Sequence, residues 1–176
     1  MQVALTKPEI ERLFRALDAE LKAMAVVGEV YVVGGAVLCL VFEVRPSTKD
    51  VDGHFAPTQK IRQAAARVAA TRDLPENWLN DAAKGFLSSR GGYRLFLELP
   101  NLRVFTAQPE YLLAMKCMAF RLGGEFHDEA DIRFLLRYLN IESYDAALAI
   151  ITRYYPLEGF PQKTLYALEE ILSSKA

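Results

Sequence analysis

The sequence predicts an α+β fold in which a mixed sheet flanked by helices comes first and a helical carboxy-terminal part follows. Segments with the alternation, or the β-branched and aromatic content, of strands all lie before residue 108. Residues 109–176 carry only the three- and four-residue spacing of apolar side chains that is typical of helices. We therefore expect an α+β core over residues 1–108 and a helical part, packed on that core, over residues 109–176.

The composition excludes several classes of protein. The chain has 21 Lys and Arg against 22 Asp and Glu, so it lacks the overall basic field of a dedicated DNA-binding protein. No apolar run approaches the ~20 residues of a membrane-spanning helix, and no membrane partner is expected. The amino terminus lacks the basic and then apolar segments of a signal peptide, which predicts a cytoplasmic location. Cys39 and Cys117 lie in apolar helical sequence and are expected to be reduced core residues.

The amino-terminal half predicts helices and strands in alternation. An amphipathic helix begins at Pro8, strands are expected over residues 30–33 and 50–55, and a helix is expected over residues 59–71. Trp78 is expected to anchor a short helix that ends near Gly85. The first helix has an apolar stripe formed by Ile10, Leu13, Phe14, Leu17 and Leu21.

A hairpin and then helices follow. Tyr93 to Leu99 alternates in a way that places Glu98 opposite the leucines, and after a turn the chain returns over residues 102–106. Gly123-Gly124 is expected to stop the first helix, and Asp128 is expected to be the N-cap of the second. The helices are expected over residues 109–122, 128–140, 144–155 and 162–173.

The chemistry of the chain is concentrated after the first strand. Gly34-Gly35 turns the backbone between that strand and a buried helix over residues 36–41. Asp50 and Asp52 lie in the second strand, where side chains alternate, so both carboxylates point to one face. Neighbouring carboxylates repel each other unless a cation lies between them. Mg²⁺, held by one or two carboxylates and the phosphates of a substrate, is the cation that best suits such a pair.

The segments Gly34-Gly35-Ala36 and Arg45-Pro46-Ser47-Thr48-Lys49-Asp50-Val51-Asp52, separated by a helix-length spacer, resemble a known signature. It is that of the nucleotidyltransferase superfamily with the DNA polymerase beta-like fold. Within it, the chain resembles small prokaryotic nucleotidyltransferase-like proteins related to the toxins of type IV abortive-infection toxin-antitoxin systems. The likeness continues in Trp78-Leu79-Asn80-Asp81, in Tyr111 to Lys116, in Arg121 and in Asp128 to Ile132.

The resemblance implies a magnesium-dependent enzyme that moves a nucleoside monophosphate from a nucleoside triphosphate to an RNA, such as tRNA, or to a protein. Asp50 and Asp52 would hold Mg²⁺, and the backbone of the Gly34-Gly35 turn would receive the phosphates. It also implies that Lys116 and Asp131 belong to the active site, and that an antitoxin is a partner. The residues alone allow simpler interpretations: Lys116 snorkels from a half-buried helix, and Asp131 belongs to a helix start.

Two departures from the family pattern favour a second hypothesis. Ala36 stands where the superfamily often has a serine, so contact with phosphate rests on the backbone, Thr48 or Lys49. The additional carboxylate of many active members has no fixed position here, and Glu98 and Asp81 are the candidates. The alternative is therefore an inactive nucleotidyltransferase-fold domain that binds a nucleotide or another protein.

Overall fold

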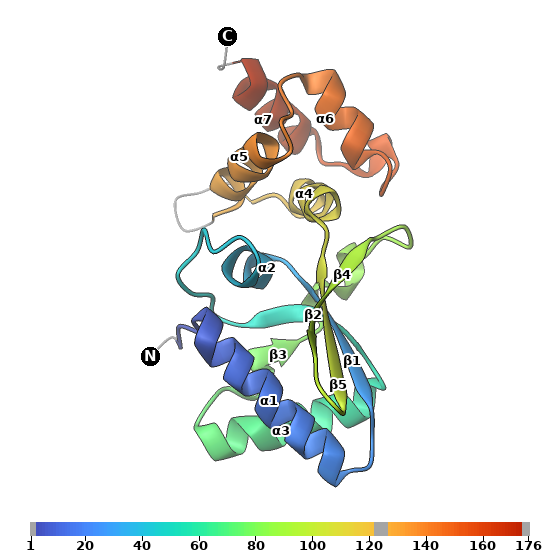
Figure 1. The fold of residues 1–176 in the computed structure, drawn as a ribbon. Helices are drawn as coiled ribbons and strands as arrows, with labels where there is room; N and C mark the ends of the chain where they lie inside the picture. The colour runs from blue at the N-terminus through green and yellow to red at the C-terminus, as the bar shows by residue number, and fades with distance from the viewer. Residues whose placement is uncertain (1–2, 122–126, 174–176) are drawn as a thin grey trace. The chain divides into compact units, whose positions relative to one another are not determined.

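The computed structural model describes residues 3–121 and 127–173, which form two units (Figure 1). The first unit consists of Met1–Gly85 and Tyr93–Ala107, and the second of Phe86–Gly92 and Gln108–Ala176. All five strands lie in the first unit, and helices dominate the second. The predicted α+β class is thus confirmed, and each unit is described below by itself.

The first unit is built on one mixed sheet with the strand order β3-β2-β1-β5-β4. Central β1 pairs antiparallel with β2 and parallel with β5, while β3 runs parallel to β2 and β4 runs antiparallel to β5. The strands are β1 (Gly28–Val33), β2 (Val51–Ala56), β3 (Leu79–Asn80), β4 (Tyr93–Glu98) and β5 (Leu102–Ala107).

Helices α1 (Lys7–Ala23) and α3 (Thr58–Arg72) cover one face of this sheet (Figure 1). Thr6 caps α1 through a capping box with Glu9, and all five residues of the predicted apolar stripe are buried. At Gly28 a β-carbon would collide with the side chain of Ile61 from α3 and crowd that of Leu21 from α1. The absence of a side chain at Gly28 therefore lets both helices approach the strand closely.

The opposite face of the sheet carries the polar and aromatic side chains of the strands. Because side chains alternate, Tyr31 of β1 lies on the face turned away from α1 and α3, as do Asp52 and His54 of β2. These three side chains are half-buried, whereas their strand neighbours on the helix-covered face are buried. We call this second face the open face.

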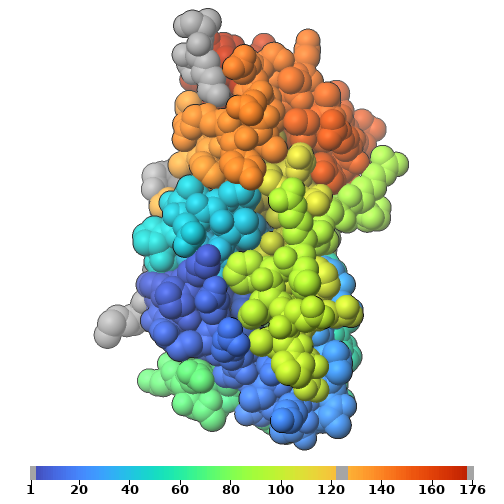
Figure 2. All heavy atoms as spheres, viewed as in Figure 1, coloured from blue at the N-terminus to red at the C-terminus, as the bar shows by residue number. Residues whose placement is uncertain are grey.

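Helix α2 (Gly35–Leu40) and the loop behind it connect β1 to β2. Thr48 in this loop forms an isolated antiparallel bridge with Leu5, with the two backbone hydrogen bonds 2.7 and 2.9 Å long. Figure 2 shows the loop (cyan) at the surface beside the start of the chain (dark blue). The path that leads into β2 is therefore fixed by a pairing with residues far away in the sequence.

The single short helix expected around Trp78 is replaced by smaller elements. Two 3₁₀ turns, Glu76–Trp78 and Ala82–Phe86, flank the two-residue strand β3. The side chain of Asn80 accepts a hydrogen bond from the Ala82 backbone amide, which competes with a continuous helix. Trp78 is the expected anchor: it is 1% exposed, and its indole N–H donates to the carbonyl of Ala65.

The hairpin of β4 and β5 is confirmed, but the strict alternation expected in β4 is wrong. A register shift between Leu95 and Leu97 changes the face of the following residues. Leu95 is opposite Phe105 on the open face, whereas Leu97 is opposite Val104 on the helix-covered face. Glu98 then lies opposite Arg103, on the open face. It therefore shares a face with Leu95 and not with Leu97.

The second unit contains four α-helices in its described residues: α4 (Pro109–Met118), α5 (Asp128–Tyr138), α6 (Tyr144–Ile151) and α7 (Gln162–Ser173), with a 3₁₀ turn at Leu157–Gly159. Helix α4 ends before the predicted Leu122, which lies outside the described residues together with Gly123-Gly124. Cys117 in α4 and Cys39 in α2 are free and buried, as expected. Within the described residues, no helix is long and apolar enough to cross a membrane.

Candidate active site

The two glycines of the turn after β1 have different surroundings. Gly34 has φ = 71° and ψ = −151°, a backbone conformation that side chains disfavour, although a β-carbon there would meet nothing within 4 Å. Gly35 has an ordinary backbone, but a β-carbon would collide with the guanidinium group of Arg45. The same β-carbon would lie 3.7 Å from the hydroxyl oxygen of Thr48. The loop behind α2 therefore folds back over the glycine turn.

Thr48 and Lys49 lead from this turn to the first aspartate. The hydroxyl of Thr48 donates a 3.2 Å hydrogen bond to the backbone carbonyl of Asp50, and its backbone is fixed by the bridge to Leu5. Thr48 thus orients the chain at Asp50. Lys49 is exposed, and its charge acts on the Asp50 carboxylate.

Asp52 lies in β2, whereas Asp50 directly precedes this strand and is not part of it as predicted. Asp52 is opposite Val33 of β1 on one side and Asn80 of β3 on the other. The Asn80 amide donates a 3.4 Å hydrogen bond to Oδ2 of Asp50. Since Val33 directly precedes Gly34, the register brings the carboxylate of Asp52 to the end of β1 at which the glycine turn begins.

Burial disfavours the charge on Asp50. It raises the pKa of this carboxyl above its ordinary value, while the hydrogen bond from Asn80 and the charge of Lys49 offset only part of the increase. Asp52 is also half-buried, and its Oδ1 atom is shielded from solvent. We call Asp50 and Asp52 the acidic pair. A cation bound to them would favour their ionised form.

This pair suits Mg²⁺, because carboxylate oxygens are the ligands that this ion prefers. Within the part of the chain that the structure describes, no group of three or more His, Cys, Asp or Glu side chains could hold a metal. Asp50 and Asp52 are the two carboxylates predicted to hold the ion. The other ligands would have to come from a substrate and from water.

Neither candidate for an additional carboxylate joins this pair. Asp81 makes a 2.5 Å ion pair with Arg62 of α3, the helix on the covered face of the sheet. Glu98 is on the open face, but it is level with Arg103 and Glu29, four residues along β1 from Val33. At about 3.3 Å per residue, this separation is roughly 13 Å along the strand.

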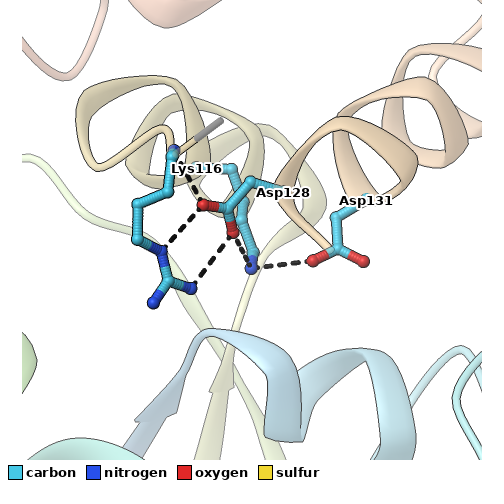
Figure 3. A network of polar contacts seen from close by, with 4 residues as sticks. Lys116, Asp128 and Asp131 are labelled. Atoms are coloured by element: carbon cyan, nitrogen blue, oxygen red, sulfur yellow. Dashed lines mark hydrogen bonds and ion pairs between the residues drawn. The ribbon is translucent and has the colours of Figure 1, made fainter. Parts of the chain in front are cut away.

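The second unit holds a separate cluster of charges around Lys116 of α4 (Figure 3). The ammonium group of Lys116 lies 2.8 Å from Oδ2 of Asp131 and 3.2 Å from Oδ1 of Asp128, both on α5. The side chain of Lys116 is 12% exposed, and both carboxylates are more deeply buried. Lys116 thus contacts two carboxylates and does not simply snorkel to water.

Asp128 is not the predicted N-cap of α5, because that position is occupied by His127. The Asp128 side chain instead accepts hydrogen bonds from the backbone N–H of Arg121, at 2.9 Å, and from its guanidinium group, at 3.0 Å. Burial raises the pKa of Asp128, but the hydrogen bonds from Arg121 and the charge of Lys116 outweigh this effect and bring the pKa below its ordinary value. Asp128 thus connects the end of α4 to the start of α5.

The structure brings the predicted site residues together in two groups. Gly34, Gly35, Thr48, Lys49, Asp50 and Asp52 lie around the turn and β2 of the first unit, and Lys116 and Asp131 lie in the second. That the two groups form one site stays a prediction. Sequence reasoning missed Asn80 as a donor to Asp50, because a two-residue strand has no periodicity to detect. It also misassigned Asp128, although the spacing of Asp128 and Asp131 by three residues places both on one side of a helix.

The chain matches no protein-family model, no curated protein and no solved structure.

Proposed function

We propose that the protein is a magnesium-dependent nucleotidyltransferase with a nucleotidyltransferase-like sheet, and that it transfers a nucleoside monophosphate from a triphosphate to an RNA or protein acceptor. One observation supports this most strongly. The strand register brings Asp52 to the end of β1 where the Gly34-Gly35 turn begins, and Asn80, which is opposite Asp52, donates a hydrogen bond to Asp50. A pair of acids next to a tight turn with little side-chain bulk suits a metal-bound triphosphate.

The residues of the first unit would have separate roles. Asp50 and Asp52 would hold Mg²⁺, which neutralises negative charge on the phosphates during transfer. The backbone at Gly34 and Gly35 would lie against the phosphates, with the guanidinium group of Arg45 next to Gly35. Thr48 would keep Asp50 in position through its hydrogen bond to the Asp50 carbonyl. Lys49, which is exposed next to the pair, would add a positive charge for the triphosphate.

The proposed reaction is an in-line displacement at the α-phosphorus. A hydroxyl oxygen of the acceptor forms a bond to this phosphorus while the bond to the bridging oxygen breaks. Pyrophosphate leaves with the electron pair of the broken bond, and the hydroxyl proton passes to solvent. A role of Lys116 and Asp131 in this step is proposed from the sequence resemblance alone, because the structure shows them paired with each other within the second unit.

The direct test is transfer of label. The protein is incubated with Mg²⁺ and each of the four nucleoside triphosphates, labelled at the α-phosphate, together with total RNA or total protein. We expect label in one acceptor fraction with at least one triphosphate, and a loss of at least about 100-fold with Asp50→Asn or Asp52→Asn. Asp81→Asn is the matched control, because its carboxylate contacts Arg62. This variant should retain transfer.

Failure of transfer with every triphosphate would contradict enzymatic activity and favour the inactive module. The remote position of Glu98 and the ion pair of Asp81 favour that alternative, because they leave the acidic pair without a third carboxylate. An inactive module that binds nucleotide should still show magnesium-dependent binding of a labelled triphosphate, and Asp50→Asn should abolish it. If the variant and the wild type bind equally, the acidic pair has no role in nucleotide binding.

A toxin role with an antitoxin partner is also part of the proposal. Its support is the sequence resemblance around Gly34-Gly35 and Asp50-Val51-Asp52. Expression of the protein alone should stop bacterial growth, and a neighbouring gene should relieve the arrest. Growth arrest by Asp50→Asn as strong as that by the wild type would show that the effect does not come from nucleotide transfer.

A further inference from the structure

A row of aromatic side chains crosses the open face of the first unit. Tyr31 is central: its ring stacks on His54 with centroids 4.5 Å apart and on Phe105 with centroids 4.9 Å apart. The planes differ by only 2° and 9°, so the three rings stand parallel on β2, β1 and β5. Tyr93 of β4 meets Tyr31 and His54 edge-on, at 5.1 and 5.7 Å. We call these four residues the aromatic row.

The aromatic row lies next to the acidic pair. His54 is two residues after Asp52, which places both side chains on the same face one pleat apart. The glycine turn lies on the other side of Asp52, because Asp52 is opposite Val33 and Gly34 follows Val33. Along the strands the order is therefore glycine turn, acidic pair and aromatic row.

The row is partly exposed and has little charge. All four rings are half-buried, and Leu95, which is opposite Phe105, extends the apolar surface with 51% of its own surface exposed. At the far end of the row, Glu29 makes a 3.2 Å ion pair with Arg103 and accepts a 3.2 Å hydrogen bond from Tyr31, so these charges balance. A flat, neutral group suits this surface better than a charged one.

The order of these features fits the geometry of the proposed transfer. In an in-line displacement, the attacking hydroxyl approaches from the side opposite the leaving pyrophosphate. If the phosphates lie against the glycine turn, the aromatic row lies on the other side of Asp52. We infer that the aromatic row binds unpaired nucleobases at the end of a single-stranded RNA acceptor, an inference that rests on the proposed function. Bases stack on aromatic side chains with little regard to sequence, and their neutral faces match the low charge of the row.

The first test changes the ligand. A fluorescent single-stranded RNA of about 12 nucleotides should bind the wild-type protein, and the same RNA with abasic residues at its last three positions should bind about tenfold more weakly. Both RNAs carry the same phosphates, so only stacking distinguishes them. Equal affinity for the two RNAs would overturn the inference, as would preference for a duplex of the same sequence.

The second test replaces residues of the aromatic row. Tyr93→Ala and Phe105→Leu should each weaken binding of the intact RNA about tenfold, and Tyr93→Phe should retain it because the ring remains. Tyr166→Ala, which removes a ring 68% exposed on α7 of the second unit, is the matched control and should bind like the wild type. Thermal unfolding shows which variants are folded. If Tyr93→Ala is unfolded, Phe105→Leu and the abasic RNA still decide the outcome.

Transfer assays distinguish failure of this inference from failure of the proposed function. If label passes to RNA and the aromatic variants lose this transfer while binding the triphosphate normally, both hold. If label passes only to protein, or passes equally to intact and abasic RNA, the enzyme stands and the inference is wrong. If no label passes to any acceptor, the proposed function is wrong, whatever RNA the row binds.

Discussion

The chain contains two pairs of aspartates whose surroundings are opposite. In the second unit, Asp128 and Asp131 share the ammonium group of Lys116, and Arg121 adds a second cation to Asp128. In the first unit, Asp50 takes a neutral amide hydrogen bond from Asn80. The pKa of Asp128 is lowered and that of Asp50 is raised, so the same type of side chain is kept ionised in one unit and penalised for ionising in the other.

This difference distinguishes aspartates whose charge is neutralised within the fold from aspartates that are able to bind an added cation. A carboxylate neutralised by its own chain contributes to the fold and has little affinity left for an added cation. A half-buried carboxylate with a raised pKa gains most when a cation arrives from outside. We therefore expect substitutions in the second unit to affect stability, and those at Asp50 to affect the response to Mg²⁺.

Lys116→Met should have the largest effect. Removing the ammonium group leaves Asp128 and Asp131 buried without their shared cation, and we expect the free energy of unfolding to fall by about 3–5 kcal/mol. Urea unfolding followed by circular dichroism measures the change. Lys163→Met on α7 is the matched control, since Lys163 is exposed, and it should change stability by less than about 0.5 kcal/mol. Equal stability of the two variants would mean that the cluster contributes nothing to the fold.

Asp128→Asn should have a smaller effect that depends on pH. At neutral pH we expect a loss of about 2 kcal/mol, because hydrogen bonds from charged donors are weakened. The lowered pKa means that this stabilisation is complete above the ordinary aspartate value of 3.8 and disappears as the pH falls through the native value. Unfolding at a series of pH values should therefore show the two proteins converging in acid. A constant difference across the series would contradict the assigned ion pairs.

Asp50→Asn should have the smallest effect, and of opposite sign. Because the native pKa of Asp50 is raised, ionisation destabilises the folded state progressively as the pH rises above 3.8. Without metal, the variant should be more stable than the wild type at neutral pH by up to about 1 kcal/mol, and equal to it in acid. Thermal unfolding at both pH values checks the sign.

With Mg²⁺ present, the wild type should be more stable than Asp50→Asn. At a concentration ten times its dissociation constant, the ion should stabilise the wild type by about 1.4 kcal/mol and leave Asp50→Asn unchanged. Glu98→Gln is the control, since Glu98 lies on the same face but far from Asp52 along the strands, and it should respond like the wild type. An equal response of all three proteins would place the ion elsewhere.

Much of the fold could be predicted because its elements have strong local signals. The apolar stripe of α1 and the positions of the four long strands along the chain follow from periodicity and turn residues. The two-residue β3 and the bulge in β4 could not be predicted in this way. Pairing with β2 defines β3, and the register against β5 defines the bulge, so both depend on partners distant in sequence.

In the candidate site, too, local features could be predicted and contacts between residues distant in sequence could not. Alternation applies within β2, which begins at Val51, so it does not extend to Asp50. That the two aspartates share a side stays a prediction. The donor Asn80 is 30 residues away in sequence from Asp50, and only the sheet brings it close. The aspartate at the start of α5 was assigned as a cap because the residue type fits, whereas its actual partners come from the end of the preceding helix.

The adjacent glycines of the turn would give different results in a library of variants. Gly34 is constrained by its dihedral angles, which lie in a region that is essentially restricted to glycine, so every side chain, asparagine included, should be costly there. Gly35 is constrained by the neighbouring Arg45, so tolerance should fall with side-chain volume and recover when Arg45 is shortened. A second substitution that shortens Arg45 should therefore suppress the defect of a Gly35 variant, whereas no such substitution should suppress the defect of a Gly34 variant.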